Sequence, residues 1–147
     1  MTRPSSPGAA LLDTDVFSIL YIDPARAAHR GHPVTDLRAR LAGLQVVIAF
    51  QTRAEVLAGA IAGNWGERRV AAARDKLDSA PTISIDREVV DAYAVLNAAC
   101  KSADHALHAK IHTGDRWIAA CAIAKGVPLL SLDGIYSGAP DLALLGG

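Results

Sequence analysis

Short apolar runs separated by helix-like stretches set the pattern of this chain. Four runs have the length and the β-branched, apolar character of buried strands, and a fifth near the end is a weaker candidate. The four span residues 9–12, 45–50, 82–85 and 128–132, and the fifth spans 142–145. Between these runs, apolar positions recur at helical spacing. We expect helices from residue 16 and from about residue 35, and over 52–62, 67–77, 87–101 and 113–125.

Strands that alternate with helices indicate an α/β fold. This order favours a mostly parallel sheet of four or five strands, with right-handed crossovers and helices on both faces. Asp86 is a natural N-cap for the helix that follows it, and Gly126 is suited to end the last helix. The proline-rich residues 1–8 are expected to form a flexible lead, and residues 9–147 a single domain.

Composition narrows the class of protein. The chain has 147 residues, of which 51% are hydrophobic and 20% charged, as expected of a packed globular fold. Basic and acidic residues balance at 15 each, so net charge does not indicate a nucleic-acid partner. The cations are mainly arginine, which suits phosphate contacts and base stacking, although a GC-rich genome would produce the same excess.

The apolar segments also predict the environment of the protein. None approaches the roughly 20 residues that a membrane-spanning helix needs, so we expect a soluble, cytoplasmic protein without a membrane partner. Cys100 and Cys121 lie in apolar, helix-like stretches and lack the CxxC spacing of many zinc sites. They are therefore predicted to be reduced thiols in the core.

Four acidic residues fall where the predicted topology brings distant segments together. Asp13 ends the first strand, and Asp133 ends the fourth. Glu55 and Asp115 each lie in the first turn of a helix. Because ligands of open parallel sheets bind beyond the carboxyl ends of the strands, we expect all four acids at one edge. Crowded carboxylates need a cation, their hard oxygens suit Mg²⁺ or Mn²⁺, and such an ion supports phosphodiester hydrolysis.

Taken singly, three of the acids also have a structural interpretation. Thr52 and Glu55 fit a capping box, in which the glutamate would accept a hydrogen bond from the backbone N–H of the threonine. Asp115 would be favourable beside a helix N-terminus in any case. Asp133 is followed by glycine, which is a common turn signal. The predicted convergence of the acids, rather than any one of them, indicates a site.

Asp13 is harder to explain by local structure, because an acid that closes a buried strand gains nothing obvious there. Asp15 is a candidate helix N-cap or a residue that orients Asp13. Two aspartates in this spacing after a strand also resemble haloacid-dehalogenase-type phosphatases, in which Asp13 would be the nucleophile and Asp15 the general acid. That alternative needs a lysine near the pocket, and Lys125 is expected at the far end of a helix.

Four segments resemble the motifs of PIN domains, especially those of the VapC toxins of bacterial toxin–antitoxin pairs. They are residues 11–18 (LLDTDVFS), 52–59 (TRAEVLAG), 115–122 (DRWIAACA) and 130–136 (LSLDGIY). Residues 140–142 (PDL) resemble the closing P-G-L of the family, with aspartate where glycine is usual. The resemblance covers nearly the whole chain in the family order. It implies a PIN-like three-layer α/β/α fold.

The same resemblance implies a toxin that is an Mg²⁺- or Mn²⁺-dependent endoribonuclease, with RNA, possibly tRNA, as substrate. It further implies a cognate antitoxin that covers the acidic pocket, and a homodimer. Carried onto this chain, it makes Asp13, Glu55, Asp115 and Asp133 the catalytic group. Asp13 and Asp115 are then the direct metal ligands. Glu55 and Asp133 contact the metal through water or help to orient the attacking water, and Ser131 binds a carboxylate or a phosphate. A non-catalytic PIN-like binding protein is a further alternative, but no acid is missing to support it.

Residues 103–112 depart from the family pattern, which often has a glycine-containing loop here. His105, His108 and His112 recur at helical spacing, so a metal or RNA contact is conceivable. Without a cysteine or a fourth ligand, a solvated helix face is the simpler interpretation.

Three aromatic residues near the motifs have either a binding or a packing interpretation. Trp65 is a candidate for stacking on bases. Trp117 and Tyr136 are expected in the core, because one opens an apolar helix and the other occupies the aromatic position after Asp133.

Overall fold

A parallel sheet of four strands forms the centre of the protein. The structure is a computed structural model that describes residues 8–25 and 34–146. The expected lead at residues 1–8 lies outside these residues except for Gly8. The strands are β1 (Ala9–Leu12), β2 (Gln45–Ala49), β3 (Thr82–Ile83) and β4 (Leu129–Leu130), in the order β3-β2-β1-β4. The prediction of a parallel α/β sheet is confirmed.

The expected strand over residues 142–145 is reduced to one parallel bridge between Leu129 and Leu144. Two hydrogen bonds frame the bridge, from Leu129 N to Ala143 O (2.9 Å) and from Leu145 N to Leu129 O (2.8 Å). Because β4 itself has only two residues, it offers little length for a fifth strand to pair with. The sheet therefore has four strands rather than five.

Helices connect the strands close to the predicted positions. They are α1 (Thr14–Phe17), followed by the π-helical turn η1 (Ser18–Ile22), then α3 (Val34–Leu41), α4 (Phe50–Ala62), α5 (Glu67–Asp78), α6 (Arg87–Ser102) and α7 (Thr113–Lys125). Three short 3₁₀ turns are η2 (Ala106–His108), η3 (Lys110–His112) and η4 (Gly134–Tyr136). Asp86 caps α6 as predicted, with its Oδ1 accepting from Val89 N at 2.9 Å. Two helices, α1 at Thr14 and α4 at Phe50, each begin two residues before their predicted starts at residues 16 and 52.

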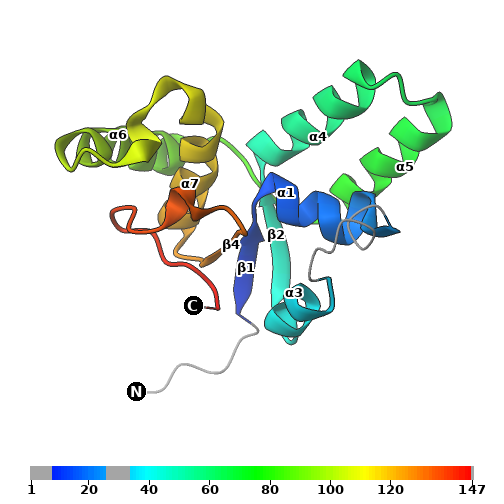
Figure 1. Ribbon diagram of the computed structural model, residues 1–147, viewed down its shortest axis with the longest axis horizontal. Helices are drawn as coiled ribbons and strands as arrows, with labels where there is room; N and C mark the ends of the chain where they lie inside the picture. Colours follow the sequence, from blue (N-terminus) through cyan, green and yellow to red (C-terminus); the bar gives the residue numbers. More distant parts are fainter. Residues whose placement is uncertain (1–7, 26–33, 147) are drawn as a thin grey trace.

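Alternating side chains of the sheet build a core on each face. On one face Leu11 and Val47 pack with α6 and α7. On the other face Leu12 and Ile48 pack with α1, η1, α3, α4 and α5. Figure 1 shows the resulting layers, with the two groups of helices on opposite sides of the sheet. This is the three-layer α/β/α arrangement that the family resemblance implied.

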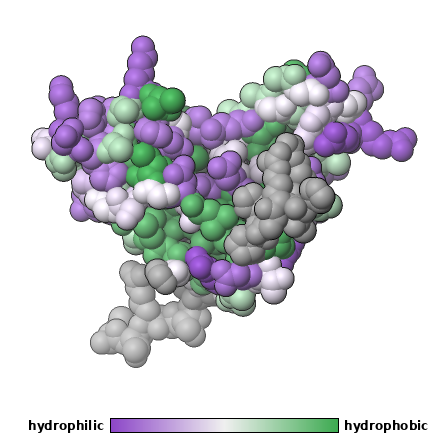
Figure 2. Space-filling view, viewed as in Figure 1, coloured by the Kyte–Doolittle hydropathy of each residue, from purple (hydrophilic) through white to green (hydrophobic). Residues whose placement is uncertain are grey.

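The two groups of helices diverge above the carboxyl ends of the strands. In Figure 1, β1 leads upward into α1 between the α6–α7 arm and the α4–α5 arm. Figure 2 shows a hollow between these arms, with hydrophilic side chains near its floor. The acids that follow β1 and β4 therefore lie at the edge of the sheet that the topology predicts for a site.

Both cysteines lie in the core, as expected. Cys100 and Cys121 are both buried and unpaired. Burial raises the pKa of the Cys121 thiol to about 12, which makes it an unreactive core residue.

Among the described residues, no helix is long and apolar enough to cross a membrane.

Candidate active site

Asp13 is held at the end of β1 by hydrogen bonds to both carboxylate oxygens. Its Oδ1 accepts from Val16 N at 2.9 Å, which makes Asp13 the N-cap of α1. Its Oδ2 accepts a short hydrogen bond from the Ser131 hydroxyl. The expectation that local structure gives Asp13 no role is therefore wrong, because it caps a helix. Asp15, the other candidate for the cap, lies exposed in the first turn.

Burial changes the ionisation of Asp13. The residue is only 4% exposed. Loss of hydration, with smaller contributions from the charges of Asp15 and Asp133, raises the pKa of Asp13 to about 6 against the opposing hydrogen bonds. An acid of this kind is costly to ionise without a cation nearby, and a bound cation would remove most of that cost.

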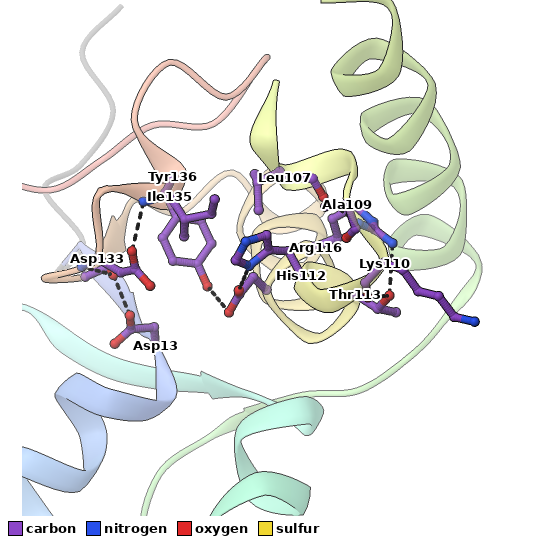
Figure 3. A network of polar contacts seen from close by, with 12 residues as sticks. Asp13, Leu107, Ala109, Lys110, His112, Thr113, Arg116, Asp133, Ile135 and Tyr136 are labelled. Carbon is purple, nitrogen blue, oxygen red and sulfur yellow. Dashed lines mark hydrogen bonds and ion pairs between the residues drawn. The ribbon is translucent and has the colours of Figure 1, made fainter. Parts of the chain in front are cut away.

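A chain of hydrogen bonds joins the ends of β1 and β4. Asp133 N donates to Ser131 Oγ at 2.9 Å, and the Ser131 hydroxyl in turn donates to Asp13. Asp133 also caps η4, because its Oδ1 accepts from Ile135 N at 2.9 Å. The turn interpretation of Asp133 is thus correct, and the turn nevertheless places it beside Asp13 (Figure 3). Of the two partners expected for Ser131, a carboxylate or a phosphate, the structure shows the carboxylate of Asp13.

Glu55 is oriented by two threonines and not by a capping box. Thr14 Oγ1 donates to Glu55 Oε1 at 2.7 Å. Since this uses the only hydroxyl proton of Thr14, the buried Thr52 is the donor in the 3.0 Å contact between the two hydroxyl oxygens. The capping-box alternative is wrong because α4 already begins at Phe50, so Thr52 lies inside the helix.

Asp115 lies in the first turn of α7 and receives one contact on each carboxylate oxygen. Tyr136 OH donates to its Oδ1 at 3.2 Å, and His112 Nδ1 lies 2.9 Å from its Oδ2. The start of α7 is pressed against α4. A Cβ added to Gly114 would lie 2.9 Å from Gln51 Nε2 and 3.7 Å from Glu55 Oε2. Gly114 therefore permits the close approach of the two helices that carry Glu55 and Asp115.

Tyr136 lies among three of the four acids. It is buried, as expected, and its burial raises the pKa of its hydroxyl. The charges of Asp115, Asp13 and Glu55 raise it further, so the hydroxyl stays protonated and donates. The fourth acid, Asp133, acts electrostatically on Asp13. The structure thus brings together all four acids that the sequence singled out, around the ends of β1 and β4.

The four carboxylates suit a hard divalent cation without forming a complete cage. Within residues 8–25 and 34–146, no three His, Cys, Asp or Glu side chains are close enough to hold a metal by themselves. Mg²⁺ commonly takes one or two carboxylates and fills its remaining positions with water and phosphate oxygens. Asp13 and Asp115 would serve as the direct ligands, and Glu55 and Asp133 would act through water. The donor set and the raised pKa of Asp13 both fit such an ion.

The three histidines do not form a common site. The interpretation of the three histidines as one helix face is wrong, since the segment forms the 3₁₀ turns η2 and η3. His105 accepts from a backbone N–H through Nδ1, so its Nε2 donates to Ser137 O at 2.8 Å and ties η2 to the end of η4. His108 lies 3.5 Å from the exposed Asp104. Of the three, it is His112 that contacts an acid of the site.

The remaining sequence candidates serve other purposes. Trp117 packs in the core, stacked on Tyr93 with the ring centroids 3.9 Å apart. The guanidinium of Arg69 lies 3.8 Å from the centroid of the Trp65 ring, and Trp65 is one of the residues that line a groove beside Glu55 and Asp133. Lys125 binds Asp86 at 2.7 Å at the far end of α7, so the lysine that a phosphatase would need is remote from the acids. Lys125 therefore does not supply the lysine of the phosphatase alternative.

The family model of the PIN domain matches residues 10–141, so the chain belongs to the PIN domain family. No curated protein matches the chain.

Several solved structures share the fold. VapBC2 from Rickettsia felis, bound to a DNA fragment from its promoter, is 17% identical with a TM-score of 0.72, over 92% of this chain and 96% of that one. VapBC-1 from nontypeable Haemophilus influenzae is 21% identical with a TM-score of 0.67, over 92% and 96% of the two chains. VapBC-5 from Mycobacterium tuberculosis is 24% identical with a TM-score of 0.60, over 96% and 100%.

Proposed function

We propose that this PIN domain is a divalent-metal-dependent endoribonuclease, and that it is the VapC-type toxin of a toxin–antitoxin pair in the cytoplasm. The observation that carries the proposal is the convergence of Asp13, Glu55, Asp115 and Asp133 at one edge of the sheet. PIN domains are generally nucleases, and the solved structures named above are toxin–antitoxin complexes. Both facts support the proposal.

In the proposed reaction, water adds to the phosphorus of an RNA phosphodiester and the bond to the leaving oxygen breaks. A bound Mg²⁺ or Mn²⁺ would supply an activated water and stabilise the charge on the phosphate oxygens. Asp13 and Asp115 would hold the ion, and Ser131 keeps Asp13 in place. Glu55 is fixed through Oε1 by Thr14, so it is oriented to position the attacking water.

A groove beside the acids suits the proposed antitoxin. It has a volume of about 670 Å³ and runs between α1–η1 and α4. Its walls are largely apolar, and the acidic residues that line it are Asp15, Asp23, Glu55 and Asp133. An apolar peptide segment that places a basic side chain among these acids would fit both properties. Such a segment would also block the catalytic carboxylates, which accounts for neutralisation.

The function is tested with the purified protein, separated from any partner and incubated with total bacterial RNA. We expect discrete fragments with Mn²⁺ or Mg²⁺ and none with EDTA. Asp13→Asn and Asp115→Asn should abolish cleavage, because each removes a ligand charge with little change of shape. Asp75→Asn, on the exposed face of α5, is the matched control and should cut like the wild type. Failure of the folded wild type to cut RNA, together with hydrolysis of a phosphomonoester, would contradict the proposal.

A further inference from the structure

Arg116 is a buried cation whose hydrogen bonds go to neutral groups. It is 5% exposed and follows Asp115 in α7. Its guanidinium donates to Ala109 O at 2.7 Å, to Thr113 Oγ1 at 3.0 Å, to Tyr93 OH at 3.3 Å and, by a short bond, to Leu107 O. No carboxylate is among these contacts in the described chain. Burying a guanidinium costs free energy unless its N–H donors are hydrogen-bonded, and the four acceptors around Arg116 supply those bonds.

The hydrogen bonds to Leu107 O and Ala109 O join Arg116 to the segment that contains η2 and η3 and ends at His112. The carbonyl of Ala109 accepts from Arg116 and also from His112 N, the latter at 2.9 Å. Thr113 Oγ1 donates to Lys110 O at 2.6 Å, which fastens the same turn from its other side. These bonds therefore fix the backbone before α7, and with it the position of the His112 backbone from which the imidazole extends.

From that position His112 reaches one oxygen of Asp115 while Tyr136 reaches the other. The His112 Nδ1 to Asp115 Oδ2 distance is 2.9 Å, and the Tyr136 OH to Oδ1 distance is 3.2 Å. In Figure 3 the rings of His112 and Tyr136 face each other, and the two contacts to Asp115 come from these rings. The side chains of His112 and Asp115 are 28% and 31% exposed, so the carboxylate remains open to a ligand.

We propose that His112 is a positioning residue that orients Asp115 for a divalent cation, and that Arg116 fixes His112 in place. The inference rests on the proposed metal-dependent function and assigns roles to two residues outside the four acids of the site. Groups that hydrogen-bond a ligating side chain typically change metal affinity by roughly 10- to 100-fold when removed.

The test is the affinity for Mn²⁺, measured by the electron paramagnetic resonance of the free ion in a titration of the whole protein. His112→Leu removes the donor and should weaken binding by roughly 10- to 100-fold. His112→Asn places an amide N–H near the position of Nδ1 and should stay within about threefold of the wild type, since the donor is restored. His108→Leu changes a histidine that does not contact the acids and is the control. Circular dichroism verifies that each variant is folded.

Each outcome separates the positioning role from the function on which it rests. Unchanged Mn²⁺ affinity in His112→Leu would overturn the role, and so would equal losses in the Leu and Asn variants. A wild type that binds no Mn²⁺ would refute the metal-dependent function, and the role with it.

The contribution of Arg116 is tested by a double-mutant cycle. Arg116→Lys keeps the charge and loses the planar set of donors that spans the carbonyls. Its effect on Mn²⁺ affinity should largely vanish in the His112→Leu background, because both changes act on the same contact. Full additivity of the two effects would overturn the assignment of Arg116.

Discussion

Asp13→Asn is predicted to stabilise the metal-free protein at neutral pH while it abolishes catalysis. Asp13 is almost fully buried, and its pKa of about 6 lies about two pH units above its ordinary value of 3.8. At 1.36 kcal/mol for each pH unit, ionising it in the folded protein costs about 3 kcal/mol. Asparagine carries no charge, and it can still accept from Val16 N as the N-cap of α1.

Part of this gain is lost in the variant. The Ser131 hydroxyl loses its carboxylate acceptor and must turn to accept from the new amide, at a cost of about 1 to 2 kcal/mol. We therefore expect a net gain of about 1 to 2 kcal/mol in the free energy of unfolding at pH 8.

The sign of the pH dependence follows from the raised pKa. Below pH 3.8 Asp13 is protonated in both the folded and the unfolded protein, and it costs nothing. Between about pH 4 and pH 6 the unfolded chain releases this proton while the folded chain keeps it, so the stability of the wild type falls as the pH rises. The advantage of Asp13→Asn should therefore be present at pH 8 and small at pH 4.5.

Urea denaturation in EDTA at the two pH values measures this difference, with equal m-values as the condition for comparison. Saturating Mn²⁺ should then reverse the order, because a ligand at 100 times its Kd stabilises the wild type by about 2.7 kcal/mol. A variant that is less stable than the wild type at pH 8 in EDTA would refute the reasoning. A stability difference of equal size at both pH values would refute it too.

Four further predictions concern the surroundings of the acids. Ser131→Ala removes a hydrogen bond that lowers the pKa of Asp13, so the acidic limb of the pH–rate profile should move to higher pH; an unmoved limb would argue against that coupling. Thr14→Val should slow RNA cleavage by roughly 10- to 100-fold through loss of the contact to Glu55, and Thr14→Ser should restore it; equal rates in the two variants would exclude a role for the hydroxyl. Trp65→Ala should weaken binding of the proposed antitoxin without reducing RNA cleavage, because the ring lines the groove and is not one of the four acids; unchanged antitoxin binding would remove the groove as its binding site. Light scattering of the protein without its partner should give twice the chain mass of 15.3 kDa, and the chain mass itself would contradict the implied homodimer.

The hydrophobic pattern was sufficient to predict the sheet and the meeting of the acids. Parallel strands share a carboxyl edge, and the predicted strand ends at Asp13 and Asp133 were enough to place the two acids together, although β4 itself already ends at Leu130. Their contact through Ser131 spans 118 residues of chain and depends on side-chain packing, which a single sequence does not reveal. The capping role of Asp13 was missed for a related reason, because a cap is defined by the residue at which the helix starts.

The histidine segment shows why periodicity alone was misleading. The spacing of His105, His108 and His112 is helical, yet Asp104 adopts a left-handed conformation (φ 53°) that ends α6. Downstream, Arg116 takes the backbone carbonyls of the segment as acceptors. Those carbonyls are then turned toward a side chain instead of a continuous helical ladder. An arginine one residue after the predicted ligand Asp115, in an otherwise apolar helix, was the available signal.

The most direct measurement of the central claim is an anomalous difference map from crystals of the protein soaked in Mn²⁺. The account predicts a peak within coordination distance of Asp13 and Asp115, roughly 2.0 to 2.2 Å for a small divalent ion with oxygen ligands, and no peak there in Asp13→Asn crystals. A peak bound elsewhere, or an undiminished peak in the variant, would contradict the assignment of these carboxylates as the metal centre.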